Sequence, residues 1–91
     1  MKTLITHIGI KELVIEAAVG KKELQEISAT DDLFEFGYNS ISIVNLIELL
    51  EDKYGIYLEP EKNIKKLNTI ENIYNILMEK SAETYAGGHF F

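Results

Sequence analysis

The chain has 91 residues, a length that supports one domain with one modest hydrophobic core. It contains no cysteine, which excludes a disulfide framework and a thiolate metal site. Its net charge of −6 disfavours nucleic-acid binding, and its short, interrupted apolar runs disfavour a signal peptide or a membrane span, so we expect a cytoplasmic monomer.

The first helix is predicted from about Thr6 to Val19. Its apolar residues recur at helical spacing, at Ile10, Leu13, Val14 and Ala17. Gly20 is placed to end the helix. Gly9 would cost roughly 1 kcal/mol inside the helix, so a start just after Gly9 is the alternative to a start near Thr6. His7 is expected at the surface without a ligand partner.

A long connection, Lys21 to Tyr38, follows without a sustained period. Its apolar residues are too irregularly spaced for one regular element: Leu24, Ile27, Leu33, Phe34 and Phe36. We expect short helical turns near Lys22–Glu26 and Asp31–Phe34 that let these side chains seal the core. Long structured loops in small domains are usually functional or packed onto the body.

The strongest helical pattern covers Ser40 to Tyr54. Its apolar residues share one face: Ile43, Leu46, Ile47, Leu50 and Tyr54. Asn39 is a good N-cap, and Gly37 supplies the backbone freedom for a tight turn into the helix. The Ser40 hydroxyl is therefore expected in solvent beside the first-turn N–H groups, where an attached phosphate would gain roughly 0.3–1 kcal/mol from the helix dipole.

Two further helices are predicted after Gly55, which ends the central helix. Pro60 suits the first position of a short third helix, from Glu61 to about Lys66. Asn68-Thr69-Ile70-Glu71 resembles a capping box that opens the last helix, with Asn68 as the cap. The last helix keeps its apolar period to about Lys80 through Ile70, Ile73, Tyr74, Leu77 and Met78.

The periodic pattern ends after Ser81. We therefore assign residues 1–80 to the folded domain and expect residues 81–91 to form a flexible C-terminal tail. The tail ends in Gly87-Gly88-His89-Phe90-Phe91, to which the sequence assigns no role.

The run Asp32-Leu33-Phe34-Glu35-Phe36-Gly37-Tyr38-Asn39-Ser40-Ile41 resembles the attachment motif of acyl and peptidyl carrier proteins. That motif is an apolar-rich turn followed by Gly, any residue, Asp or another polar residue, Ser, and then Leu or Ile. The resemblance covers about Thr6 to Met78. It implies an all-α, four-helix bundle of acyl-carrier type, with a long first loop and a short third helix.

The resemblance also implies a cofactor, 4′-phosphopantetheine transferred from coenzyme A to Ser40, whose thiol holds an acyl chain as a thioester. Many family members carry Asp where this chain has Asn39. If the modifying transferase relies on that charge, modification would be slower or would need a dedicated transferase.

As a carrier, the chain would not be an enzyme. Its length suggests a free-standing protein, with a carrier excised from a larger synthase as the alternative. The motif looks more like carriers of polyketide or non-ribosomal peptide biosynthesis than those of fatty acid synthesis, which remains an alternative. Its partners would be a phosphopantetheinyl transferase and loading, condensing or tailoring enzymes. The residues expected to contact them are Tyr38, Ile41, Ser42, Ile43, Asn45, Glu48, Glu51, Asp52 and Ile64.

Charge is unevenly spread along the chain. Ten acids and only one base, Lys53, lie from Glu23 to Glu61. This concentration of negative charge would steer a basic partner surface toward Ser40.

Two rival functions belong to other classes. In a helical adapter, Ser40 would only help to start a helix. A serine hydrolase is disfavoured because Ser40 lacks the Gly-x-Ser-x-Gly turn, and because His7 and His89 lie near opposite termini. We also find no metal-binding spacing of His or Cys.

Overall fold

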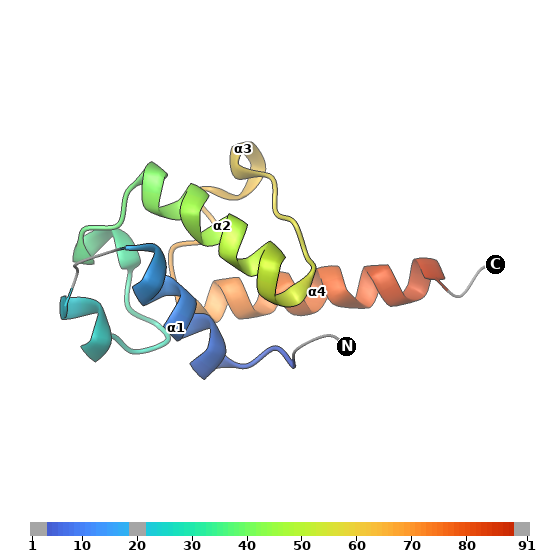
Figure 1. The fold of residues 1–91 in the computed structure, drawn as a ribbon, viewed down its shortest axis with the longest axis horizontal. Helices are drawn as coiled ribbons and strands as arrows, with labels where there is room; N and C mark the ends of the chain where they lie inside the picture. Colours follow the sequence, from blue (N-terminus) through green and yellow to red (C-terminus); the bar gives the residue numbers. More distant parts are fainter. Residues whose placement is uncertain (1–3, 19–21, 89–91) are drawn as a thin grey trace.

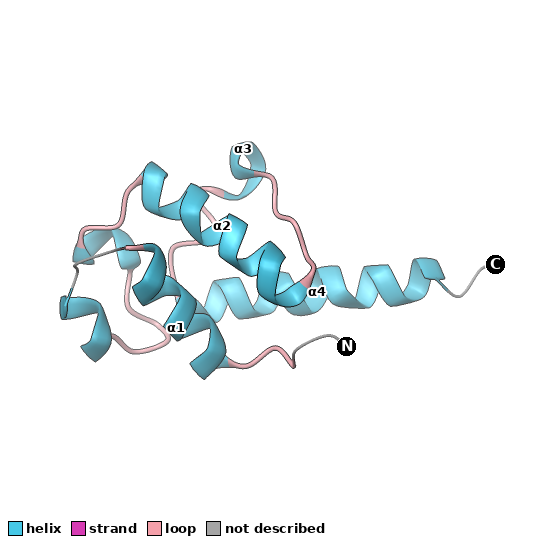
Figure 2. Ribbon diagram, in the orientation of Figure 1, coloured by secondary structure: helices cyan, strands magenta, loops and turns pink. Residues whose placement is uncertain are grey.

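The computed structural model describes residues 4–18 and 22–88, and these residues are helical without any strand (Figures 1 and 2). In chain order the elements are α1 (His7–Ala17), the 3-10 turns η1 (Lys22–Glu26) and η2 (Leu33–Phe36), α2 (Ser40–Tyr54), α3 (Pro60–Asn63) and α4 (Ile70–Gly88). The predicted all-α bundle of four helices, with a long first loop and a short third helix, is confirmed.

The core lies between α1, α2 and α4, and α3 packs against α2. The predicted apolar stripes of α1 and α2 are all buried. The long connection contributes Leu24, Ile27 and Leu33 to the same core, whereas Phe36 is half-buried and Phe34 is 39% exposed. The turn at Lys22–Glu26 is confirmed, and the second turn begins at Leu33, two residues later than predicted.

Helix α1 begins at His7, which confirms the predicted start near Thr6 and contradicts the alternative start after Gly9. The Thr6 side chain caps the helix, because its Oγ1 accepts a hydrogen bond of 2.9 Å from the Gly9 N–H. The helix ends at Ala17, and the predicted end at Val19 and Gly20 lies outside the described residues.

Gly9 is retained inside the helix because α2 approaches it closely. A Cβ atom at this position would lie 2.6 Å from the Tyr54 hydroxyl and 3.0 Å from Thr6 Oγ1. Tyr54 is only 2% exposed, so its ring has little room to move. The hydroxyl lies beside the Thr6 backbone without hydrogen-bond geometry, and burial raises its pKa above the ordinary tyrosine value.

We predict that Gly9→Ala destabilises the protein despite the higher helix propensity of alanine. Overpacking a core costs about 1–3 kcal/mol, which exceeds the roughly 1 kcal/mol gained from propensity. Urea unfolding followed by circular dichroism measures the loss. In a Tyr54→Phe background, which removes the clashing oxygen, Gly9→Ala should be neutral or stabilising; an equal loss in both backgrounds would contradict this explanation.

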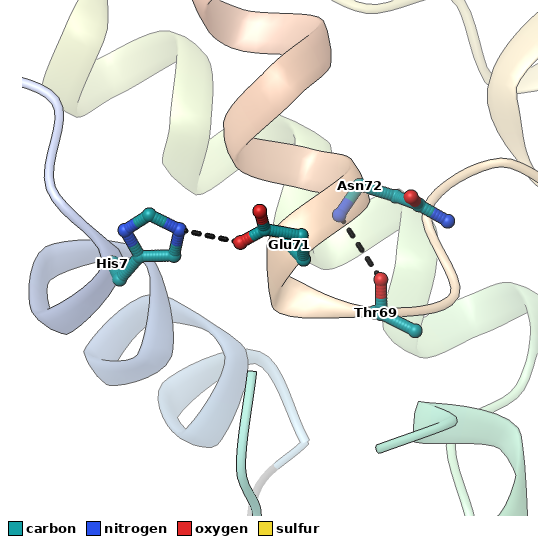
Figure 3. A network of polar contacts seen from close by, with 4 residues as sticks. All are labelled: His7, Thr69, Glu71 and Asn72. Carbon is teal, nitrogen blue, oxygen red and sulfur yellow. Dashed lines mark hydrogen bonds and ion pairs between the residues drawn. The ribbon is translucent and has the colours of Figure 1, made fainter. Parts of the chain in front are cut away.

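The last two helices each differ from the prediction at one end. Pro60 occupies the first turn of α3 as expected, but α3 ends at Asn63 and is shorter than predicted. Helix α4 is capped by Thr69, whose Oγ1 accepts from the Asn72 N–H at 3.0 Å (Figure 3), so the assignment of Asn68 as the cap is wrong. The Asn68 carbonyl instead accepts from the Leu33 N–H at 2.7 Å, which ties this residue to the long loop.

His7 joins the start of α1 to the start of α4. Its Nε2 lies 2.7 Å from Glu71 Oε2 (Figure 3), and its ring stacks on Tyr74 at a centroid distance of 4.0 Å. The His7 side chain is 44% exposed, in keeping with the predicted surface position, and its contacts with Glu71 and Tyr74 are ones that the sequence did not indicate. Glu71 does not close the predicted capping box because its carboxylate is directed to this histidine.

Helix α4 continues to Gly88, beyond the rest of the bundle (Figure 1), so the prediction that the helix ends near Lys80 is wrong. The segment after Lys80 contains no proline, so nothing in it blocks the continuation of the helix, although it lacks an apolar stripe. Phe90 and Phe91 lie outside the described residues. Among the helices that the structure describes, none is long and apolar enough to cross a membrane.

Candidate functional site

Tyr38 anchors the loop two residues before Ser40. Its side chain is 3% exposed, and its hydroxyl donates a hydrogen bond of 2.6 Å to the Val14 carbonyl. Val14 lies in the last turn of α1, where carbonyl groups lack intrahelical donors, so the tyrosine supplies the missing partner. The prediction that Tyr38 contacts partner enzymes is wrong, because its side chain belongs to the core.

We predict that Tyr38→Phe destabilises the protein by about 1–3 kcal/mol at neutral pH, because it leaves a buried carbonyl unpaired. Burial raises the pKa of the Tyr38 phenol in the folded state. Its contribution to stability is therefore complete below the ordinary tyrosine pKa of about 10 and is lost as the pH rises above it. Chemical unfolding from pH 7 to 11 should show a shallower loss for Tyr38→Phe than for the wild type; identical slopes would contradict the assignment.

The turn into α2 is built from local signals. Asp32 Oδ1 accepts from the Phe34 N–H at 2.9 Å and caps η2. Gly37 then adopts a left-handed conformation with φ of 96°, which favours glycine. With Leu33 buried on one side and Tyr38 on the other, this turn fixes where α2 begins.

Asn39 caps α2 as predicted. Its Oδ1 accepts from the Ser42 N–H at 3.0 Å and lies 3.3 Å from the Ser42 hydroxyl. The first backbone bond of the helix runs from the Ile43 N–H to the Asn39 carbonyl at 3.0 Å. The N–H groups of Ser40 and Ile41 come before the first donor of the helix, so they have no acceptor within it. They lie at the N-terminus, which is the positive end of the helix dipole.

We predict that Asn39→Ala destabilises the protein by about 1 kcal/mol, because the Ser42 N–H loses its acceptor. Asn39→Asp keeps an acceptor oxygen and should retain wild-type stability or exceed it. Thermal unfolding of the three proteins tests this ranking. If the alanine and aspartate variants unfolded together, Asn39 would have no role as a cap.

Ser40 is the first residue of α2, and its side chain is exposed. Both neighbours in sequence, Asn39 and Ile41, are exposed as well, so an incoming group meets no buried barrier. The exposed hydroxyl and the adjacent first-turn N–H groups suit a phosphodiester, which needs an accessible oxygen and favours hydrogen-bond donors. The local structure therefore fits a phosphopantetheine arm at this position.

The two isoleucines that flank Ser42 face opposite ways. Ile43 is 0% exposed and lies in the core, so its predicted contact with partners is wrong. Ile41 is 72% exposed, and Val44, one turn further along, is 40% exposed. The sequence reasoning missed Val44, although its spacing of three from Ile41 and its place outside the buried stripe could have identified it.

The remaining predicted contact residues are distributed along the outer side of α2 and after α3. The exposed ones are Asn45, Glu48, Glu51 and Asp52. Ser42 is half-buried within the cap, and Ile64 is half-buried against the core. Their contact with partners stays a prediction.

A serine hydrolase would need a histidine beside Ser40. His7 instead contacts Glu71 and Tyr74. His89 lies outside the described residues. Within the part of the chain that the structure describes, no group of His, Cys, Asp and Glu side chains is arranged to hold a metal ion.

Comparison with known proteins identifies the family. A family model described as "Phosphopantetheine attachment site" matches residues 10–77, which include the turn, Ser40 and three of the four helices in full or in large part. The chain belongs to the phosphopantetheine-attachment family. This family assignment confirms the resemblance seen in the sequence.

The carrier is similar to an acyl carrier protein of Chloroherpeton thalassium, with 33% identity over 69 residues that cover 75% of this chain and 81% of the relative. It also shares its fold with 3-oxo-butyl-ACP from the actinorhodin polyketide synthase of Streptomyces coelicolor, solved by NMR. That likeness has a TM-score of 0.72 and 21% identity, and it covers 91% of this chain and 98% of the other.

The protein is therefore a carrier whose cofactor is covalent phosphopantetheine. Proteins of this family interact with enzymes that modify them and with biosynthetic enzymes. The buried anchor at Tyr38 and the cap at Asn39 hold the start of α2 in place, while Ser40 remains open to solvent.

Proposed function

We propose that Ser40 carries 4′-phosphopantetheine and that the chain tethers acyl or aminoacyl intermediates on it. The observation that carries this proposal is the exposed hydroxyl at the first residue of α2, inside the region that matches the attachment family. When bound, the arm supplies a thiol that holds the intermediate as a thioester.

The residues around Ser40 have different structural roles in this proposal. Tyr38 fixes the loop to α1 through its bond to Val14, and Asn39 fixes the first turn through Ser42. The N–H groups of Ser40 and Ile41 favour the negative charge of a phosphodiester. The protein itself contributes placement rather than catalysis, because tethering raises the effective concentration of an intermediate at each docked enzyme.

Partner enzymes would approach along α2. The apolar pair Ile41 and Val44 lies beside the attachment point, and the exposed acids Glu48, Glu51 and Asp52 follow further along the helix. A basic partner surface would be attracted to the acids, while the apolar pair would provide the short-range contact. The first of these partners would be a phosphopantetheinyl transferase.

We assign the carrier to polyketide or non-ribosomal peptide biosynthesis, served by loading, condensing or tailoring enzymes. The support is the uncharged start of α2: this helix resembles that of carriers of fatty acid synthesis, which tend to have acids near its start, where this chain has Ser42 and Asn45. Fatty acid synthesis is the second candidate, because similarity to an acyl carrier protein is compatible with either pathway. Measuring acyl transfer to the loaded carrier from enzymes of each pathway distinguishes the two.

The proposed function is tested by incubating the purified chain with a promiscuous phosphopantetheinyl transferase and coenzyme A. We expect the intact mass to increase by one arm. An adapter without a prosthetic group would keep its mass, and a serine hydrolase would instead react with an acylating probe. Either outcome, with the transferase active on a control carrier, would overturn the proposal.

A further inference from the structure

Four lysines, Lys62, Lys65, Lys66 and Lys80, lie on or beside α4, although the chain has a net charge of −6. Lys65 and Lys66, in the turn after α3, line a hollow of about 430 Å³. The opposite wall comes from α4 and the residues before it, and the remaining lining residues are Asn68, Asn72, Asn75 and Ile76. A positively charged concavity thus exists in an otherwise acidic protein.

A second hollow of about 330 Å³ continues the first, because Lys66 and Ile76 line both. Its other lining residues are Lys62, Asn63, Glu79 and Lys80. We call the two hollows together the lysine groove. None of its lining residues belongs to α2, so the groove is separate from the helix that begins at Ser40.

The charge of the groove is only partly compensated within the protein. Lys62 lies 3.6 Å from Glu59, and Glu79 is the single acid among the lining residues. Lys65 and Lys66 are exposed and have no ion pair among the described residues. Two ammonium groups are therefore available to an incoming negative charge.

The asparagines add directional hydrogen bonding. Asn72 Nδ2 donates to Asn68 Oδ1 at 2.8 Å, which orients both amides at the wall of the groove. An asparagine side chain offers both donors and acceptors, as the main chain of a peptide does. Ile76, which is half-buried, supplies an apolar portion of the same wall.

We propose that the lysine groove docks a short acidic peptide segment of a partner protein. Its lysines would pair with carboxylates, its amides with the peptide main chain, and Ile76 with an apolar side chain. A long nucleic acid fits less well, because the concentrated acids from Glu23 to Glu61 would repel a polyanion that extends beyond the groove.

This docking goes beyond the proposed attachment at Ser40 and does not depend on it. A partner held at the lysine groove would leave α2 uncovered, so the start of α2 would stay accessible to a second enzyme. Because the lysines are exposed, binding should be weak and should weaken further with salt.

The test is an NMR titration of the full chain, labelled with ¹⁵N, at low salt with a synthetic peptide in which Glu alternates with Leu. A peptide with Gln in place of Glu is the uncharged control. We expect shifts centred on residues 62–76 for the acidic peptide alone. Lys66→Gln should raise Kd about fivefold, whereas Lys11→Gln, which removes the same charge outside the groove, should raise it less than about twofold.

Lys65→Gln is a second variant of the groove and should also weaken binding. Ser40→Ala should bind the peptide like the wild type, so a failure of peptide binding can be told apart from a failure of arm attachment. Equal effects of Lys66→Gln and Lys11→Gln would overturn the proposal. Shifts centred on α2, or tighter binding of a single-stranded oligonucleotide of equal charge, would overturn it as well.

Discussion

Ser40→Ala is expected to abolish loading by a phosphopantetheinyl transferase, because it removes the only atom proposed to form the phosphodiester. The exposed side chain makes no hydrogen bond on which the described fold depends, since Asn39 and not Ser40 caps α2. We therefore expect the unfolding free energy to change by less than about 0.5 kcal/mol. Intact mass after the reaction, with circular dichroism of the variant, measures both effects.

Ser42→Ala is the matched control for this experiment. Ser42 lies two residues further along the same helix, and its hydroxyl is 3.3 Å from Asn39 Oδ1. Because this hydroxyl is half-buried in the cap, we expect its loss to leave the added mass unchanged. Loading of Ser40→Ala, or loss of loading in Ser42→Ala with its fold intact, would contradict the assignment of the attachment oxygen.

Ile43→Ala is expected to cost about 2–5 kcal/mol of stability, because it removes a fully buried side chain and leaves a cavity in the core. Domains of this kind are stable by roughly 5–15 kcal/mol, so the variant would lose a large fraction of its stability. Urea unfolding of the purified proteins gives the free-energy difference directly.

Ile41→Ala is the matched control, since it removes the same atoms from the same helix at a position that is 72% exposed. Its stability should change by less than about 0.5 kcal/mol. Its effect should appear instead as slower loading by the transferase, because Ile41 lies beside the attachment point. Equal destabilisation by the two substitutions would mean that the burial pattern of α2 is incorrect.

The start and end of α2 could be predicted from the sequence because local and periodic signals agree there. Asn39 caps the helix, Gly55 adopts a left-handed conformation with φ of 72° at its end, and the apolar stripe lies between them. The same stripe already placed Ile43 in the core. The apolar spacing alone therefore indicates that Ile43 is buried, and its assignment to a partner surface does not follow from the pattern.

Other features depend on residues far apart in the chain, which a single sequence does not connect. Tyr38 is buried because its hydroxyl reaches Val14, 24 positions away, and His7 meets Glu71 across 64 positions. A contact with a distant residue also decides which of two adjacent residues caps α4. Asn68 and Thr69 are both good caps by type, but a bond from the Leu33 N–H occupies the Asn68 carbonyl.

The lysine groove depends both on a local run of lysines and on contacts between residues far apart in the chain. The run from Lys62 to Lys66 is visible in the sequence, and it would suit an ordinary solvated surface. Only the structure brings it opposite Asn72 and Asn75 on α4 and so turns a run of charge into a concave site.

The central claim is that Ser40 is the oxygen that carries the arm. Trypsin cleavage after Lys22 and Lys53 releases residues 23–53, which contain Ser28, Ser40 and Ser42. Fragmentation of this peptide from the loaded carrier in a mass spectrometer locates the added group on one residue. We predict that it lies on Ser40; an arm on Ser28 or Ser42, or an unmodified peptide after a reaction that loads a control carrier, would contradict the claim.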